Sequence, residues 1–357
     1  MGLLCALLSL ILCPMLLTSC AHGLYLGKLA WGEAQVLGGR VSNQEVLKDA
    51  TIDEEIKEGI RLAQAVAEFS EKKLGLRADG CYKSFYHVKG DALIYLVSAC
   101  PKDSLEPYTW RFPIVGEMEY KGFFNKKDAV KEIKRLEEQG FDTCLQHAIA
   151  FSTLGWLNDP IYSTILGHHP VVIINIIIHE LVHNTVFFKG ETALNEGLAS
   201  FIAEKGTLLF ITEQFGASSP QYQLALDLNR DEELISGVFE ALYDALQKLY
   251  TQDITREEKI DKREEIFAHG QRCLADLNNQ FKKKNFSVSM GGLNNAVVLA
   301  HRRYHFPSEG LIVKAYEALG EDLKGLVELL RTARKSKEEP SRFLEKWLQE
   351  RSGYPPG

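Results

Sequence analysis

The feature that most constrains the fold is a long apolar run near the middle of the chain. Apolar residues fill most positions from Val171 to Phe187, and isoleucine and valine dominate among them. Such β-branched residues suit a buried strand, but strands rarely exceed about 10 residues. A helix that is apolar on nearly all sides is typical of the centre of a large core. We therefore predict a buried central helix over residues 171–189.

This run contains the HExxH motif, His179-Glu180-Leu181-Val182-His183. Residues four apart lie on one face of an α-helix, so both imidazoles can bind one Zn²⁺ with bonds of about 2 Å. Glu180 lies beside the first histidine, where it can act as a general base on water that the metal activates. Asn175 lies one turn earlier on the same face, where it can orient a ligand or make an ordinary core or capping hydrogen bond. The motif predicts a catalytic site with one zinc per chain.

A catalytic zinc site needs a third protein ligand and an open position. Glu196 can supply the ligand, because Gly190 is expected to end the first helix and Glu196 follows near the start of a helix that can fold back. Four other candidates lie in the turn or farther from the motif along the chain: Glu191, Glu204, His168 and His169. The predicted metal ligands are therefore His179, His183 and Glu196.

Composition and charge exclude some classes of function. The chain is 45% hydrophobic and 25% charged, as in an ordinary globular protein. Its net charge is -7, with both signs spread along the chain, which argues against nucleic-acid binding because that needs a basic face. None of the cysteines forms a CxxC pair, so a structural cysteine zinc site is not expected. Cys81 and Cys100 flank two strand-like runs, and either a disulfide or two buried thiols is consistent with the sequence.

The first twenty residues differ from the rest of the chain. Gly2 to Ser19 contains no charged residue and is rich in leucine. The segment Leu17-Thr18-Ser19-Cys20 resembles a bacterial lipobox, in which the cysteine is lipidated after cleavage before it. We predict a lipoprotein signal peptide over residues 1–20 and a lipidated Cys20 that holds the protein on a membrane of the bacterial cell envelope, facing the periplasm or exterior. An uncleaved anchor and a plain secretory signal are the alternatives, and all three place the remaining chain outside the cytoplasm.

The chain after the leader shows no internal repeat and no low-complexity linker. We expect a single domain over residues 21–357, with an α+β part at about 21–143 and a helical metal-site part at about 144–357. The predicted fold class is α+β and mostly helical, with a small mixed sheet beside the HExxH helix.

Periodicity predicts the main elements of this domain. Helical spacing covers residues 21–75, and strands and turns are expected over 82–124, with a further strand-like run at 148–154. Two long amphipathic helices are expected in 222–284, and a last pair of helices at about 293–351.

At the metal motif the sequence resembles known peptidases. Asn195-Glu196-Gly197-Leu198-Ala199 is similar to the segment that carries the glutamate ligand in alanyl-type zinc aminopeptidases, although only twelve residues separate His183 from Glu196 here. The closer resemblance is to a bacterial family, the putative aminopeptidases, which are HExxH proteins with predicted lipoprotein signals. It covers most of the mature chain. Besides residues 179–200, it rests on Tyr120 to Phe124, Ser152 to Trp156 with Asp159-Pro160, and Leu293 to Ala296 followed by Tyr304.

The resemblance implies a gluzincin arrangement and peptide substrates. A strand around Ser152 to Gly155 would bind the peptide as an added strand, unless it is an ordinary core strand. Tyr304 is the leading candidate to stabilise the oxyanion, with His301 and His305 behind it. Aminopeptidase action also needs an acidic partner for the free amine of the substrate, and Glu191 is the one weak candidate.

Three other functions are consistent with the sequence. The chain can be a zinc endopeptidase, a lipoprotein scaffold that keeps zinc and binds peptide without cleaving it, or a chaperone-like envelope protein with no metal. Glu180 counts against the scaffold, because a structural zinc site needs no base. The metal content of the purified protein separates the third possibility from the others.

Overall fold

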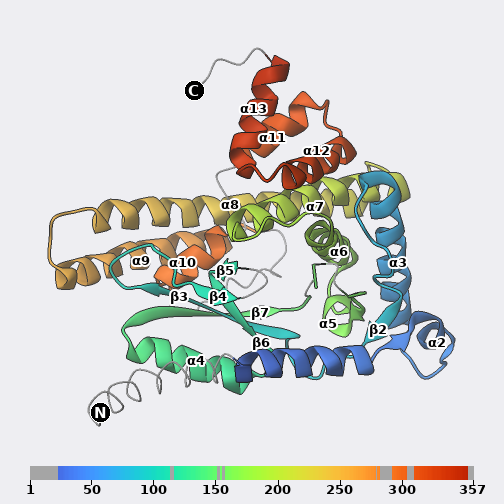
Figure 1. Ribbon diagram of the computed structural model, residues 1–357, viewed down its shortest axis with the longest axis horizontal. Coiled ribbons are helices and arrows are strands. Elements are labelled where there is room, and N and C mark those ends of the chain that lie inside the picture. The colour runs from blue at the N-terminus through green and yellow to red at the C-terminus, as the bar shows by residue number, and fades with distance from the viewer. Residues whose placement is uncertain are drawn as a thin grey trace, which may run out of the picture.

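The computed structural model is a mostly helical α+β fold with small sheets, as the sequence predicts (Figure 1). It describes residues 23–112, 116–150, 153–154, 157–278, 280–281, 292–303 and 309–352. The predicted signal peptide with Cys20, and the candidates Tyr304 and His305, lie outside the described residues. Of the helices within those ranges, none has both the length and the hydropathy that a membrane crossing needs.

A helix over residues 23–38 opens the described chain. The labelled helices are α2 (Asn43–Lys48), α3 (Glu54–Leu74), α4 (Lys126–Glu138), α5 (Ser163–Leu166), α6 (Pro170–Thr185), α7 (Thr192–Phe215), α8 (Pro220–Tyr250), α9 (Arg256–Asn278), α10 (Asn295–Arg302), α11 (Glu309–Ala318), α12 (Leu323–Ser336) and α13 (Pro340–Ser352). The strands are β1 (Val41–Ser42), β2 (Ser84–Tyr86), β3 (Ile94–Pro101), β4 (Trp110–Phe112), β5 (Gly116–Met118), β6 (Tyr120–Phe123), β7 (Phe141–Ala148) and β8 (Ile161–Tyr162).

The largest sheet is antiparallel, with the order β6-β3-β7. In its centre Val97 lies opposite Lys121 on β6 and Leu145 on β7. Figure 1 shows α4 and the helix 23–38 below this sheet and the α8–α9 pair with α10 above it. Because both faces are covered, most of β3 is buried although its neighbours are only partly so.

The prediction of one small mixed sheet is only partly correct. Mixed pairing occurs in the short β1-β2-β8 sheet, where β2 is antiparallel to β1 and parallel to β8. The β4-β5 pair is separate from both larger sheets among the described residues. Pro101 ends β3, and Pro107 interrupts the chain again before β4, so the region is divided into short pieces that pair in different places.

The strand predicted over residues 148–154 is wrong for the described part of that range, because β7 ends at Ala148. Beyond it, the Thr164 hydroxyl donates to the Ile149 carbonyl (2.5 Å), and the Thr153 amide donates to the Asp159 carboxylate (3.2 Å). Leu154 then adopts a left-handed backbone with φ of 55°. Side-chain hydrogen bonds thus take the backbone groups that a strand would pair with its neighbour, which local apolar alternation does not reveal. Ser152 and Gly155 lie outside the described residues.

The predicted central helix is confirmed as α6, which lies between α3 and α7 in the main core. It ends at Thr185, four residues earlier than predicted. Val186 is extended, with φ of -134° and ψ of 122°. The side chain of Asn195 holds the next segment, since it accepts from the Phe188 amide (2.8 Å) and donates to the Phe188 carbonyl (2.7 Å). The backbone amide and carbonyl of Phe188 therefore bond to Asn195 and not within α6. This agrees with the end of α6 at Thr185.

The predicted break between two long amphipathic helices is confirmed, because α8 ends at Tyr250 and α9 begins at Arg256. The last predicted pair of helices instead comprises four, α10 to α13, in the described residues. Asp322 caps the start of α12 by accepting from the Lys324 amide (3.0 Å), and Lys337 ends that helix with φ of 62°. These local stops divide one long apolar pattern into short helices.

The core contains one very close contact between helices and two buried cysteines. Gly206 on α7 lies so close to α6 that an added Cβ atom would be 3.2 Å from the Ile178 side chain and 2.9 Å from Leu74. Cys81 and Cys100 are both buried and both free, so the disulfide alternative is excluded.

Candidate metal centre

Three side chains from α6 and the start of α7 converge at one point in the core. The Nε2 atom of His179 lies 3.2 Å from Nε2 of His183 and 3.3 Å from Oε2 of Glu196, and His183 Nε2 lies 3.5 Å from that same oxygen. All three groups are largely buried. The predicted ligands thus come together as one His-His-Glu group that could hold a metal ion.

The donor spacing fits a small tetrahedral ion. Four ligands at about 2.0–2.1 Å from a tetrahedral Zn²⁺ are separated from one another by about 3.3–3.4 Å. The three observed separations lie within 0.2 Å of that range. Two imidazoles and one carboxylate are also the ligand types of catalytic zinc sites.

The electrostatics of the group agree with this geometry. Burial alone would raise the pKa of Glu196, but His183 and His179 lower that pKa well below its ordinary value. Within the described chain, the buried Nδ1 atom of His183 has no hydrogen-bond partner. A buried carboxylate held in its charged form beside two ring nitrogens is an arrangement that a bound cation stabilises.

Glu180 lies next to the group without belonging to it. Its side chain lines the cavity that the histidines face, and it is not among the three clustered ligand atoms. Burial raises the pKa of Glu180 to about 7, the charge of His179 opposes this rise, and the carboxylates of Glu196 and Asp159 add to it. Glu180 therefore has the position and the acidity of a group that can take up and release a proton near neutral pH.

Local sequence explains why the ligands meet. Pro170 starts α6, and His169 precedes it as the cap, with Nδ1 accepting from the Val171 amide (3.3 Å). His169 is thus occupied as a helix cap. At the other end, the bonds between Asn195 and Phe188 close the turn from α6 to α7. The neighbouring Glu196 is thereby directed back toward α6.

The main cavity has a volume of about 710 Å³ and holds the metal group in its wall. Its lining is largely apolar and comes mainly from helix 23–38, the β6-β3-β7 sheet, the β4-β5 pair, the segment after β7, and α6, with Glu196 from α7. The apolar residues among the lining include Tyr25, Leu29, Ile94, Leu96, Phe112, Met118, Phe124, Ile176 and Phe187. A cavity with apolar walls and a few polar groups is typical of a ligand-binding site.

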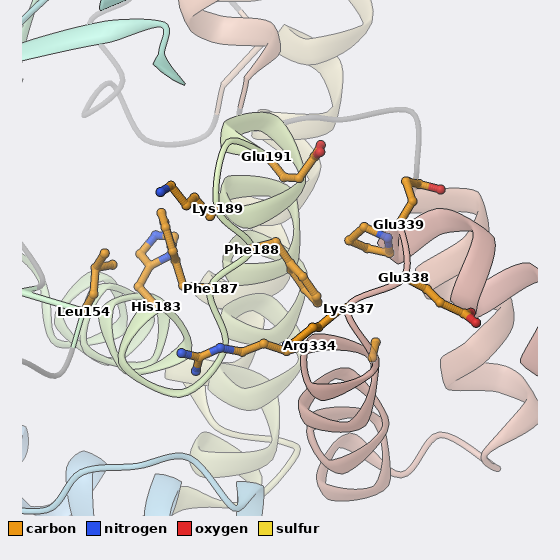
Figure 2. A pocket seen from close by; sticks show the side chains of 12 residues that line it. Leu154, His183, Phe187, Phe188, Lys189, Glu191, Arg334, Lys337, Glu338 and Glu339 are labelled. Atoms are coloured by element: carbon orange, nitrogen blue, oxygen red, sulfur yellow. The ribbon is translucent and has the colours of Figure 1, made fainter. Parts of the chain in front are cut away.

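A second cavity of about 600 Å³ lies between the end of α6 and the turn from α12 to α13 (Figure 2). Leu154, His183 and Phe187 line both cavities, so the wall that carries the metal group separates them. Figure 2 shows Arg334 reaching from α12 toward His183 and Phe187, whereas the acidic side chains at the α12–α13 turn lie on the far side.

The comparison with known proteins agrees with this site. A family model described as "Putative aminopeptidase" matches residues 24–344. The chain belongs to this aminopeptidase family. No curated protein and no solved structure matches the chain. The family match includes helix 23–38, both cavities and all three clustered ligands, so the site is part of what the family model covers.

The other candidates from the sequence lie in various places in this aminopeptidase-family fold. Asn175 lines the main cavity one turn before His179, as predicted. Glu191 lines the second cavity, and Glu204 pairs with Lys205 (2.7 Å) away from the ligands. The imidazole of His301 stacks on Phe239 with ring centroids 3.9 Å apart, and His301 is not among the described residues that line either cavity.

Sequence reasoning gave no role to two carboxylates near the site. Asp159 is buried and holds the segment after β7 through the Thr153 amide, and burial raises the pKa of Asp159 to about 6. Its Asn-Asp-Pro context indicated only a turn. Glu33 lines the main cavity from helix 23–38, and nothing in the local sequence distinguishes it from any other helix glutamate.

Proposed function

We propose that this protein is a zinc-dependent peptidase of the gluzincin type that acts as an aminopeptidase. The observation that carries the proposal is the set of three donor separations, 3.2, 3.3 and 3.5 Å, among His179, His183 and Glu196. These match a tetrahedral zinc site with one position left for solvent or substrate. Membership of the aminopeptidase family supports peptide as the substrate class.

In this proposal His179, His183 and Glu196 hold the zinc. A bound zinc supplies a Lewis acid that polarises a peptide carbonyl and lowers the pKa of water to about 7. Glu180 removes a proton from the attacking water and then gives it to the departing amine. The cavity supports this role, because Glu180 lines it beside both histidines and a peptide bond placed there would be within reach.

The proposal also assigns supporting groups. Asn175 lines the cavity one turn before His179 and can bond to the main chain of the peptide. Thr153 and Leu154 line it from the segment after β7, which suits contact with an extended peptide. Tyr304, which lies outside the described residues, is proposed to donate to the oxyanion of the tetrahedral intermediate.

The test is a hydrolysis assay on the purified mature chain, with its zinc content measured first. We expect about one zinc per molecule. Peptides with a free amino terminus should be cleaved at the first bond, a chelator should abolish cleavage, and added zinc should restore it. Equal cleavage of free and acetylated peptides would favour an endopeptidase. A zinc-loaded protein that cleaves nothing across a broad peptide library would favour the scaffold, and a protein that binds no zinc would sink the proposal.

We also propose that the protein is attached to a membrane of the cell envelope through a lipid on Cys20. The lipobox-like segment at residues 17–20 supports this. Replacing Cys20 with Ala should prevent lipidation and release or mislocalise the protein. An unmodified amino terminus on membrane-bound wild-type protein would contradict the attachment.

A further inference from the structure

The charges that line the main cavity are unusual for a peptide site. Three lining residues in the described chain carry carboxylates, Glu33, Glu180 and Glu196, and no lysine or arginine is among the lining residues. Glu196 is a proposed zinc ligand, and Glu180 is the proposed base. Glu33 has neither role and comes from a different part of the chain, the helix over residues 23–38.

Packing contacts of the helix 23–38 fix the position of Glu33 at the cavity. The residue before it, Gly32, lies so close to the sheet side of the cavity that an added Cβ atom would be 2.2 Å from the Phe124 ring. Two turns earlier in the same helix, the Tyr25 hydroxyl donates to the Gly122 carbonyl (2.8 Å). The helix therefore cannot shift away from the cavity without losing both of these contacts, which precede Glu33.

The Glu33 carboxylate makes no hydrogen bond and no ion pair with any residue in the described ranges. Arg40, whose charge lowers the pKa of Glu33, donates from Nε to the Leu37 carbonyl (3.2 Å) and from a terminal nitrogen to the Asn158 carbonyl (2.9 Å). Burial raises the pKa of Glu33, and the charge of Asp159 adds to the rise. A partly desolvated acid without a partner is stabilised when a cation binds to it.

The same acid is electrostatically connected to the proposed base. Asp159 raises the pKa of Glu33 and also that of Glu180, and Tyr162 is affected by all three carboxylates. Glu33, Glu180 and the metal ligands also line the same cavity. A peptide that fills this cavity therefore contacts walls that carry both acids.

We infer that Glu33 determines specificity for the amino terminus: its carboxylate binds the free α-ammonium of a peptide whose first side chain lies against the apolar wall of the cavity. An ammonium group offers three donors to an acid that has no other partner. The apolar lining near the same helix, which includes Leu29 and Phe124, selects an apolar first residue. This inference rests on the proposed zinc peptidase function.

The decisive experiment compares Glu33→Gln with wild type on two matched peptides, one with a free and one with an acetylated amino terminus and both with leucine first. For the free peptide kcat/KM should fall about 10- to 100-fold, the usual effect of losing one charge-assisted hydrogen bond. Cleavage of the acetylated peptide, zinc content and Tm should not change. Glu58→Gln, an exposed glutamate on α3, is the matched control and should leave all four readouts at wild-type values.

Binding gives a second readout that does not depend on turnover. Titration of zinc-loaded protein with leucinamide should show a Kd about 10- to 100-fold weaker in Glu33→Gln than in wild type. The same difference should persist in a Glu180→Gln background, in which cleavage is removed.

The outcomes separate this inference from the proposed function. If wild type cleaves peptides but Glu33→Gln leaves the preference for free amines unchanged, the inference is wrong and the peptidase proposal stands. Equal losses on both peptides would assign Glu33 a structural role and overturn the inference. A loss of preference in Glu191→Gln instead would place the amine in the second cavity. A zinc-loaded wild type that cleaves no peptide would overturn both proposals, whereas one that cleaves peptides but does not bind leucinamide would overturn only this inference.

Discussion

Two clusters of buried polar groups differ in how their members are satisfied. In the metal centre, two ring nitrogens and a carboxylate oxygen face one another at 3.2–3.5 Å, and the buried Nδ1 of His183 has no partner within the described chain. The second cluster, around Asp142 and Arg263, joins β7 to α9. Here each charged group faces a group of opposite charge.

The second cluster is a complete network. Arg263 donates to both oxygens of Asp142 (2.7 and 3.3 Å) and to the Lys102 carbonyl (2.8 Å). The backbone amide of Asn295 donates to Asp142 (3.1 Å), and the side-chain oxygen of Asn295 accepts from the Tyr250 hydroxyl (2.9 Å). All of these donors face acceptors, so the cluster needs no ligand to be stable.

The comparison shows how to separate a site from a structural network. Asn294 and Asn295 belong to a segment that carries the family resemblance, and polar side chains of this kind could also line a binding site. The structure instead uses Asn294 to cap α10 and to donate to the Thr143 carbonyl (3.0 Å). A buried carboxylate grouped with two imidazoles at metal-ligand spacing indicates a cation site, whereas a cluster in which charged donors face charged acceptors indicates a role in stability.

The largest expected effect is on catalysis at the metal centre. Glu180→Gln keeps the size of the side chain and removes the base, so peptide hydrolysis should fall by about two to four orders of magnitude. Zinc content and Tm should remain those of wild type, because Glu180 is not one of the three clustered ligands. Measuring kcat beside zinc stoichiometry checks this. Hydrolysis at the wild-type rate would show that the base is another group.

Breaking the second cluster should affect stability and leave the chemistry alone. Arg263→Met leaves the charge of Asp142 buried without its partner, which should cost about 3–5 kcal/mol in the free energy of unfolding. Zinc affinity and the kcat of the folded fraction should be unchanged. Denaturant unfolding with and without zinc gives the measurement. Replacing Asp142 with Asn as well should recover part of the loss, and a fall in kcat with no loss of stability would contradict the division between the two clusters.

In contrast to Arg263→Met, a change in one metal ligand should weaken zinc binding. Glu196→Gln replaces a charged ligand with a neutral amide and should weaken zinc binding by at least about 10- to 100-fold, the usual cost of losing even an outer-shell partner. Competition with a zinc chelator measures the change. Glu204→Gln on the same helix is the matched control, since Glu204 pairs with Lys205 away from the ligands. Equal zinc affinity in wild type and Glu196→Gln would move the third ligand elsewhere.

The smallest effect concerns the two buried thiols, one near each cluster. Cys81 accepts from Asn184 (3.5 Å) beside the metal centre, whereas Cys100 donates to the Ser104 carbonyl (3.2 Å) near the second cluster. Because both are free, a reductant should not change Tm, although loss of a disulfide would typically cost about 2–4 kcal/mol. Burial raises the pKa of both thiols, so alkylation should be slow until the protein is unfolded. A fall in Tm on reduction would mean that a covalent bond joins the two regions.

The sequence was sufficient to predict contacts between residues that are close together in the chain. His179 and His183 share a helix face, and Glu196 follows after one turn, so a local argument was sufficient to bring them together. The predicted strand after Ala148 failed because Asp159 and Thr164 take its backbone groups, and these partners come from later turns of the chain.

Contacts between segments that are far apart in the chain could not be predicted from a single sequence. Glu33 enters the cavity only because Gly32 allows its helix to pack on Phe124, and no local pattern encodes that approach. The side chains of Asn294 and Asn295 have the right character for a site, but these residues bond instead to partners on β7, on α8 and at the end of β3.

The close packing at Gly206 has a consequence for the choice of ion. Glu196 and His179 lie on different helices, so the distance between these two ligands follows the distance between α6 and α7. Gly206, about three turns beyond Glu196, lets α7 approach Ile178, the residue directly before His179. The ligand spacing is therefore set by helix packing before any ion arrives. Calcium, which needs more oxygen ligands at about 2.3–2.6 Å, would have to push the helices apart. A single missing methyl group thus contributes, through the packing of α7 on α6, to the spacing of the metal ligands.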